Sequence, residues 1–361
     1  MSKIVVKIPK EDIIYDIHVK ANQLDTLAEI IAANDHSNLF IIDDINVDNL
    51  YGKVMRNSFL KAGMKSYTYT MPDGENEKNW YRAKEIMDAA FEKGLDRKSA
   101  FIAFGGGVVG DLVGFISSLY MRGIDYYQVP TTLIAQVDSC IGGKTAVNHK
   151  KGKNLIGSFY HPRAVFSDTT LLSSLPKREL ISGLSEVVKY AVISDIELFN
   201  FLDDHYQYLL NENQNDLYHK IVARCCEIKA EIVEKDEKDH GLRRFLNFGH
   251  TIGHGLESSS RGLLNHGEAV AIGMVLASKI SVDLGMLKSK EKDRIEKLLS
   301  KLGLPTKANE FNLQEVIRYI EYDKKKVDGS FNFVLPSSIG VMNSKLVKVD
   351  KAHLLKILEK N

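Results

Sequence analysis

The sequence predicts an α/β domain with a mostly parallel sheet, followed by a mostly α-helical domain. Short apolar runs alternate with amphipathic stretches through the first half of the chain, the pattern of strand–helix units whose strands pair in parallel. From about residue 176 the apolar residues instead recur with a helical period over long stretches. We place the boundary between residues 1–177 and residues 178–361, although no glycine- or serine-rich linker marks it.

The first half contains strands and helices in alternation. The expected strands are runs of apolar, aromatic and β-branched residues, which favour an extended backbone. The expected helices carry apolar residues three and four positions apart. The strands are expected at residues 39–43, 66–70, 99–104 and 126–129, the helices at 47–62, 77–93 and 108–120, and a further segment opens at Thr131.

The second half is expected to be mostly helical. Pro176 suits the start of the first helix, because a first-turn N–H would have no helical partner in any case. Two short apolar runs near the end, 331–336 and 339–342, are expected to pair as a hairpin before a final helix. The main helices are expected at 178–192, 216–238, 249–258, 268–284 and 290–301.

Composition limits the partners and the compartment. Lys and Arg outnumber Asp and Glu by 48 − 47 = +1, so the overall charge gives no reason to expect nucleic acid or an anionic membrane as a partner. Three cysteines, Cys140, Cys225 and Cys226, cannot build a disulfide framework or a paired C-x-x-C site. The chain starts without an apolar signal segment and contains no run of roughly 18 apolar residues. We therefore expect a cytoplasmic protein.

A glycine-rich loop follows the expected strand at 99–104. Gly105, Gly107 and Gly110 fit the pattern G-x-G-x-x-G and open an expected helix, which is the context that a dinucleotide-binding loop requires. Glycines let the backbone approach a pyrophosphate at the helix N-terminus. At least two strand–helix units precede this loop, whereas a simple Rossmann unit carries it after its first strand. A tight turn without a ligand is the alternative interpretation.

Two earlier segments also favour a nucleotide. Residues 43–46 and residues 73–78 each follow an expected strand and are rich in groups that bind ribose hydroxyls. Taken singly, each is more simply a helix cap or a turn. Together with the glycine loop they predict a Rossmann-like first domain.

Two glycine turns present lysines. The string 141–145 resembles the end of a Walker A loop, but Asp138 stands where that motif requires its first glycine, so a P-loop is excluded. Lys144 on this turn, and Lys153 beside Asn154 on a second turn at 151–154, suit anion binding. A solvated surface loop is the alternative for both.

The helical half contains a candidate metal site. His250 and His254 lie four residues apart on one expected helix face, and His266 follows 16 residues after His250. Glu186 stands one helical turn before Lys189. Imidazole and carboxylate suit Zn²⁺ or a similar divalent ion, and three protein ligands leave positions open for substrate.

Separate core and surface histidines are the alternative to a metal site. Glycines beside the histidines, Gly249, Gly253 and Gly267, argue against that alternative, because glycine costs roughly 1 kcal/mol in a helix interior and so indicates close approach of another group. The spacing is not H-E-x-x-H, which excludes a metalloprotease of that type.

Taken together, these motifs resemble those of the 3-dehydroquinate synthase family within the sugar phosphate cyclase superfamily. The resemblance runs through nearly the whole chain and is densest from Asp73 to His266. Its most specific strings lie at 105–115, 128–133, 138–148, 183–190 and 247–254. It implies a dehydroquinate synthase-like fold, a homodimer, NAD in the first domain and Zn²⁺ or Co²⁺ in the second.

The resemblance also implies which residues form the sites. The metal ligands would be Glu186, His250 and His266. NAD would contact Asp44, Asn46, Asp73, Gly74, Glu75, Asn76, Glu77, Lys78, Gly107, Val108, Val109, Gly110, Asp111, Thr131, Thr132, Lys144, Lys153, Leu171, Leu172, Ser173 and Ser174. The substrate would contact Asp138, Lys144, Asn154, Lys189, Lys229, Arg243, Asn247, His254 and Lys324, and Arg122 would reach the phosphate site of a neighbouring subunit.

The implied reaction converts 3-deoxy-D-arabino-heptulosonate 7-phosphate into 3-dehydroquinate and phosphate, the second step of the shikimate pathway of aromatic amino acid biosynthesis. Such an enzyme is a carbon–oxygen lyase. The metal activates a substrate alcohol for hydride transfer to NAD⁺, phosphate is eliminated, the hydride returns, and an intramolecular aldol step closes the ring. His254 would relay a proton toward the phosphate end.

Two departures and three alternatives accompany this resemblance. Asp239 stands where many relatives have glutamate, and either Lys324 or Lys325 could face the substrate. The alternatives are an NAD-dependent polyol dehydrogenase, a cyclase for uncarboxylated sugar phosphates, and a nucleotide-binding scaffold with structural histidines. Arg243 and Asn247, with a basic residue at 324, favour a carboxylated substrate.

Overall fold

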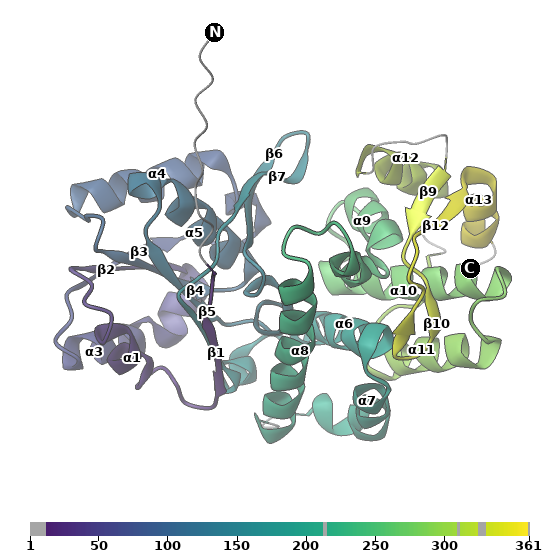
Figure 1. Ribbon diagram of the computed structural model, residues 1–361, viewed down its shortest axis with the longest axis horizontal. Coiled ribbons are helices and arrows are strands. Elements are labelled where there is room, and N and C mark those ends of the chain that lie inside the picture. Colours follow the sequence, from purple (N-terminus) through teal and green to yellow (C-terminus); the bar gives the residue numbers. More distant parts are fainter. Residues whose placement is uncertain (1–11, 212–214, 309–310, 324–329, 360–361) are drawn as a thin grey trace, which may run out of the picture.

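The computed structural model describes residues 12–211, 215–308, 311–323 and 330–359. An α/β part, coloured purple to blue-teal, leads into a helical part, coloured teal to yellow (Figure 1). This arrangement confirms the fold class that the sequence predicts. The lysines at 324 and 325, one of which is expected to contact substrate, lie outside the described residues.

The sheet of the α/β part has six strands in the order β1-β8-β5-β4-β2-β3, and every neighbouring pair is parallel. The expected strands correspond to four of them, while β1 and β8 form an edge that the sequence analysis missed. The strands are β1 (Asp16–Lys20), β2 (Leu39–Asp44), β3 (Ser66–Met71), β4 (Ala100–Gly105), β5 (Asp125–Pro130) and β8 (Ala164–Asp168).

Helices cover both faces of this sheet, which explains the continuous apolar runs of its central strands. Along β2, Phe40 and Ile42 pack in the core beneath α4 and α5, whereas Leu39 and Ile41 pack in the core beneath α1 and α3. These helices are α1 (Leu27–Ala32), α3 (Lys53–Lys61), α4 (Trp80–Glu92) and α5 (Gly107–Leu119). The single helix expected at 47–62 is observed as α2 (Ile45–Val47), a π-helical turn η1 (Asp48–Gly52) and α3.

Residues 152–154 of the predicted second lysine turn instead begin one strand of a two-stranded ribbon. Strands β6 (Lys144–His149) and β7 (Gly152–Phe159) pair antiparallel and project from the α/β part (Figure 1). The hairpin turn lies at 150–151, so the prediction that Lys153 and Asn154 lie in a turn is wrong. Gly157 permits the close pairing, because a Cβ there would lie 2.4 Å from the carbonyl oxygen of Thr145.

The helical part is built around two buried helices. Helix α10 is buried on nearly all sides from Ala269 to Ala277, as expected of a helix at the centre of a bundle. Helix α6 packs against it and is buried from Ser182 to Ile193. The helices are α6 (Lys177–Ser194), α7 (Ile196–Leu209), α8 (Asn215–Lys235), α9 (His250–Ser259), α10 (His266–Asp283), α11 (Ser289–Lys301), α12 (Leu313–Asp323) and α13 (Lys351–Glu359).

The expected C-terminal hairpin is only partly correct. Strand β10 (Pro336–Ser338) pairs with β11 (Val341–Met342), but β9 (Ser330–Phe333) pairs instead with β12 (Val347–Asp350). In that pair Phe331 lies opposite Val349, and both are buried. Long-range burial therefore decides this pairing. Among the described residues, no helix has both the length and the apolar character that a membrane span requires.

Candidate active site

Three predicted metal ligands from three helices meet in the helical part. Glu186 lies in α6, while His250 and His266 are the first residues of α9 and α10. One ligand atom from each lies within 4.8 Å of the others. The Nε2 atoms of His250 and His266 lie 3.5 Å and 3.3 Å from Glu186 Oε1. The structure thus brings together the set that the sequence predicts.

The Glu186 carboxylate is fully buried yet poorly satisfied. Its Oε2 pairs with the Lys189 ammonium one turn along α6, but no donor among the described residues meets hydrogen-bond geometry at either carboxylate oxygen. A buried carboxylate in this state is costly unless a cation neutralises it. The donor set of one carboxylate and two imidazoles therefore fits a divalent metal ion.

Local sequence fixes the two histidines. Asn265 and Glu268 form a capping box at the start of α10, which sets His266 in its first turn. Gly267 lets α10 approach α6, since a Cβ there would lie 2.1 Å from the carbonyl oxygen of Ser182. Gly249 precedes His250 with φ 79°, and a Cβ there would meet the Met274 side chain at 2.6 Å. The glycines beside the histidines therefore serve close helix packing.

The protonation of the histidines reflects the surrounding charges. Burial lowers the pKa of His250 to about 3, so its imidazole is neutral. Burial opposes protonation of His266 as well, but the Glu186 and Glu257 carboxylates on either side of its ring raise the pKa of His266 to about 10.

Asp138 joins the glycine turn to two lysines of the helical part. It lies in the π-helical turn η4 (Ala135–Ser139), where Lys189 Nζ is 3.3 Å from its Oδ2 and Tyr190 donates a hydrogen bond of 2.9 Å to its Oδ1. Lys229 pairs with the same carboxylate and donates to the Asp138 carbonyl oxygen at 2.5 Å. Burial opposes ionisation, but the charges of Lys189 and Lys229 hold the pKa of Asp138 well below its usual value. Cations predicted to bind an anionic substrate are thus concentrated here.

Arg243 and Lys144 bridge the two parts of the chain. Arg243, in the 3₁₀ turn η6 (Leu242–Asn247), donates to the carbonyl oxygens of Gly142 at 2.8 Å and Glu237 at 2.5 Å and is almost fully buried. Lys144 forms an ion pair of 2.5 Å with Asp239. Asp239, the departure from the family pattern, therefore lies beside a predicted substrate lysine.

The predicted nucleotide contacts gather at the carboxyl ends of the parallel strands. Most of them follow β2, β3, β4, β5 and β8, and those after β8 lie in the 3₁₀ turn η5 (Thr169–Ser174), whereas Lys144 and Lys153 lie on β6 and β7. The chain runs from β2 outward to β3 and then returns to β4 on the other side of β2. Ligands of open α/β sheets bind at such a switch point, and the glycine loop after β4 lies there.

Individual contacts at this edge are consistent with a nucleotide cradle. A Cβ on Gly107 would lie 3.2 Å from Ser139 Oγ, so glycine keeps the first turn of α5 open. Lys78 is buried and bonds to Asp111 in α5 and to Asn154 in β7, at 2.5 and 2.7 Å. Asp44 caps α2 by accepting from two backbone N–H groups. The capping alternative for Asp44 is therefore realised in this structure.

His254 lies beside the predicted metal ligands, whereas Arg122 lies far from the glycine loop. The His254 ring lies 5.4 Å from that of His250 and 6.1 Å from that of His266, beside the metal cluster but outside its ligand set. Arg122 follows the C-terminal end of α5, whose 13 residues place it about 20 Å from the glycine loop. Arg122 and Met121 both have positive φ, at 70° and 52°.

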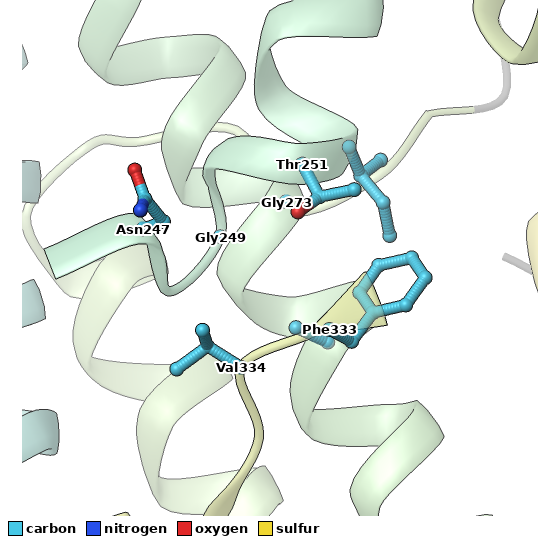
Figure 2. Close-up of a pocket in the computed structure, with 8 residues that line it drawn as sticks. Asn247, Gly249, Thr251, Gly273, Phe333 and Val334 are labelled. Atoms are coloured by element: carbon cyan, nitrogen blue, oxygen red, sulfur yellow. The ribbon is translucent and has the colours of Figure 1, made fainter. Parts of the chain in front are cut away.

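Asn247 lies at the end of η6 and lines a narrow pocket that has no room for a water molecule. Figure 2 shows Phe333 and Val334 opposite Gly249 in this pocket, between α9, α10 and β9. Its eight lining residues include none of the predicted lysine, arginine or metal ligands. We regard it as a packing gap behind the site.

Two polar residues of the site were missed by sequence reasoning. Tyr190 bonds to Asp138, and Glu257 contacts both His266 and Lys153. The spacing of His250, His254 and Glu257 is 4 and 3 residues, which places all three on one helix face. That spacing was an available signal for Glu257, whereas the Tyr190 contact depends on the tertiary fold.

Comparisons with known proteins agree with these features. The N-terminal model of 3-dehydroquinate synthase matches residues 68–182, and the C-terminal model matches residues 183–326. The chain is 42% identical over 347 residues to a 3-dehydroquinate synthase of Thermoanaerobacter sp. (strain X514), covering 96% of this chain and 97% of the relative.

Solved structures of related enzymes have the same fold. One is a 2-epi-5-epi-valiolone synthase from Streptomyces hygroscopicus subsp. jinggangensis with NAD⁺ and Zn²⁺ bound (TM-score 0.88, 30% identity, 99% of both chains). Another is a 2-deoxy-scyllo-inosose synthase complexed with carbaglucose-6-phosphate, NAD⁺ and Co²⁺ (TM-score 0.88, 26% identity, 96% of both chains). The two family models together match residues 68–326, and the Thermoanaerobacter relative is 42% identical over 96% of this chain. The chain therefore belongs to the 3-dehydroquinate synthase family.

Proposed function

We propose that this protein is a phosphate-eliminating carbon–oxygen lyase that converts 3-deoxy-D-arabino-heptulosonate 7-phosphate into 3-dehydroquinate. The observation that carries the proposal is the position of the Glu186/His250/His266 cluster beside a dense group of cations. Lys189 contacts both Glu186 and Asp138, so the metal cluster and the anion-binding group share one side chain. Membership of the 3-dehydroquinate synthase family supports the same activity.

The cofactors are NAD and a divalent metal, Zn²⁺ or Co²⁺. Glu186, His250 and His266 would hold the metal, and the glycine loop and the strand ends would hold NAD. The bound metal would polarise a substrate hydroxyl, and NAD⁺ would take up a hydride and later return it. NAD⁺ with Zn²⁺ or Co²⁺ in the two related synthases supports this assignment.

The chain's own residues bind and orient the substrate. A phosphate at one end and a carboxylate at the other require paired cations, which Lys144, Lys229 and Arg243 supply. Arg243 is fixed by two backbone carbonyls, which pre-organises its guanidinium. Asp138 raises the pKa of the buried Lys189 and opposes the lowering that burial causes in the pKa of Lys229, and it contacts both ammonium groups. His254, beside the metal cluster, is positioned to move a proton.

We further propose that the enzyme is a homodimer in which Arg122 completes the neighbour's phosphate site. Arg122 lies at the far end of α5 from its own glycine loop. Leu119, at the end of α5 and three residues before Arg122, is an exposed apolar side chain and favours burial against a partner. The strained backbone at Arg122 is also typical of a functional residue.

The domain boundary and the compartment are proposals as well. We place the boundary at 177/178, in the first turn of α6, shortly after η5 ends at Ser174. The free, buried thiols of Cys140, Cys225 and Cys226 support a location in the reducing cytoplasm.

A cyclase for an uncarboxylated sugar phosphate is the second candidate function, because the related 2-deoxy-scyllo-inosose synthase is complexed with carbaglucose-6-phosphate, which has no carboxylate. Metal-loaded protein with catalytic NAD⁺ should be incubated separately with the heptulosonate phosphate, sedoheptulose 7-phosphate and glucose 6-phosphate. We expect phosphate release and dehydroquinate from the first alone, without net NADH. Turnover of an uncarboxylated sugar phosphate would favour the second function, and stoichiometric NADH from a neutral polyol would favour a dehydrogenase.

A further inference from the structure

The two carboxylate oxygens of Glu257 contact different parts of the molecule. One contacts a predicted metal ligand, and the other contacts the α/β part. Its Oε2 lies 3.2 Å from His266 Nδ1, and its Oε1 accepts a hydrogen bond of 2.5 Å from Lys153 Nζ. Glu257 lies in α9, seven residues after His250 and therefore on the same helix face. Its side chain is only 15% exposed, which strengthens both interactions relative to the surface.

The two predicted histidine ligands are held in the same way. His250 directs Nδ1 at the carbonyl oxygen of Phe248, 3.1 Å away, and Nε2 at Glu186. His266 directs Nδ1 at Glu257 and Nε2 at Glu186. In each ring an acceptor at Nδ1 holds the hydrogen there, so that Nε2 carries the lone pair that a metal needs. The acceptor for His266 is a carboxylate rather than a carbonyl.

We propose that Glu257 is a positioning residue that fixes the tautomer and orientation of His266 and increases its basicity as a metal ligand. The inference rests on the proposed metal site. Glu257 acts through His266 and does not itself belong to the ligand set. A carboxylate behind a ligating histidine typically contributes 10- to 100-fold to metal affinity.

The same carboxylate joins the metal site to the nucleotide side of the molecule. Lys153 lies on β7, next to Asn154, which bonds to Lys78, and Lys78 bonds to Asp111 at the start of α5. Because Lys153 is about half exposed, its ion pair contributes less than the buried contact with His266. Lys153 therefore holds Glu257 in place, while the contact between Glu257 and His266 sets the affinity.

The test is the affinity of the purified full-length protein for Zn²⁺ or Co²⁺, measured by competition with a chromophoric chelator. We expect Glu257→Ala to weaken binding about 10- to 100-fold. Glu257→Gln should fall between wild type and Glu257→Ala, because an amide oxygen still accepts the Nδ1 hydrogen without the charge. Lys153→Met should weaken binding no more than about 5-fold. Glu227→Gln, an exposed partner of Arg224 on α8, is the matched control and should leave the affinity unchanged.

The metal-free proteins should also be compared by thermal unfolding. A positioning role predicts that metal raises the melting temperature of Glu257→Gln, relative to the metal-free form of the same variant, less than it raises that of wild type. Wild-type affinity in both Glu257 variants would overturn the inference and leave the metal site intact. A wild-type protein that binds neither ion would instead overturn the proposed metal site itself. If Glu257→Ala does not fold, the isosteric Glu257→Gln decides by the same criteria.

Discussion

Lys144, on strand β6, and Asp239, in the segment between α8 and η6, form an ion pair of 2.5 Å across the two parts of the molecule. Lys144 is half exposed in this arrangement, so its ammonium is accessible to a ligand. Asp239 has φ 62°, an uncommon conformation for a residue other than glycine. The pair therefore places a cation at the junction between the glycine turn and the helical part.

Replacing Lys144 by methionine should weaken substrate use. Removal of one cation that bonds an anionic group costs about 1.5–3 kcal/mol, or roughly 10- to 100-fold in kcat/KM. The measurement is phosphate release at several substrate concentrations. Lys151→Met, on the exposed hairpin turn, is the control and should behave as wild type. An unchanged kcat/KM for Lys144→Met would remove Lys144 from the substrate site.

Variants of His254 and of Glu186 should differ in their effects on turnover and on metal binding. Glu186→Ala deletes a buried carboxylate of the ligand cluster and should lose bound metal and activity together. His254→Ala should retain metal but turn over about 10²- to 10⁴-fold more slowly, because it loses a general acid–base group. Metal content by atomic emission and kcat by phosphate release distinguish the two. Loss of metal in His254→Ala would make His254 a ligand.

Metal removal should destabilise the wild-type protein more than Glu186→Ala. Metal bound only by the folded state adds about 2.7 kcal/mol of stability when its concentration is 100 times the dissociation constant. Dialysis against a chelator should therefore lower the melting temperature of wild type, whereas Glu186→Ala should not respond. Restoring Zn²⁺ or Co²⁺ should reverse the change. An equal response in both proteins would place the stabilising metal elsewhere.

Asp43 should make stability depend on pH. Burial raises the pKa of Asp43 to about 7, so the folded chain keeps a proton that the unfolded chain loses near pH 4. The free energy of unfolding should thus fall as the pH rises from about 4 to about 7, by roughly 2–4 kcal/mol from this group, and then level off. Asp43→Asn cannot ionise and should gain stability over wild type at pH 8 but not at pH 4.5. Denaturant unfolding at both pH values tests this, and parallel curves for the two proteins would contradict it.

Gly267→Ala should disturb the metal cluster through packing. The added Cβ would lie 2.1 Å from the Ser182 carbonyl oxygen and should force the start of α10, with His266, away from α6. We expect a loss of about 1–3 kcal/mol in the free energy of unfolding and weaker metal binding. Ser289→Ala, at the exposed start of α11, is the control and should leave both stability and metal binding close to wild type. Wild-type metal affinity in Gly267→Ala would show that α10 can shift without moving His266.

Much of the architecture was predictable because it follows from local sequence. The apolar strands β2, β4 and β5 and the glycine loop after β4 each carry a short-range signal, since period, burial on both faces and glycine spacing act over a few residues. The ribbon β6–β7 was missed because its alternation is interrupted by glycines and lysines that also suit turns. The pairing of β9 with β12 was missed because burial of Phe331 against Val349 links residues 18 positions apart.

The sequence by itself determined which chemical groups the active site contains. It supplied Glu186, His250 and His266 as ligand types and the glycines that let their helices approach. Only the tertiary structure decided that Glu257 lies behind His266 and that Asp138 contacts both Lys189 and Lys229. These relationships join residues from different helices. Their distances depend on how the helices pack, which no spacing along the chain can specify.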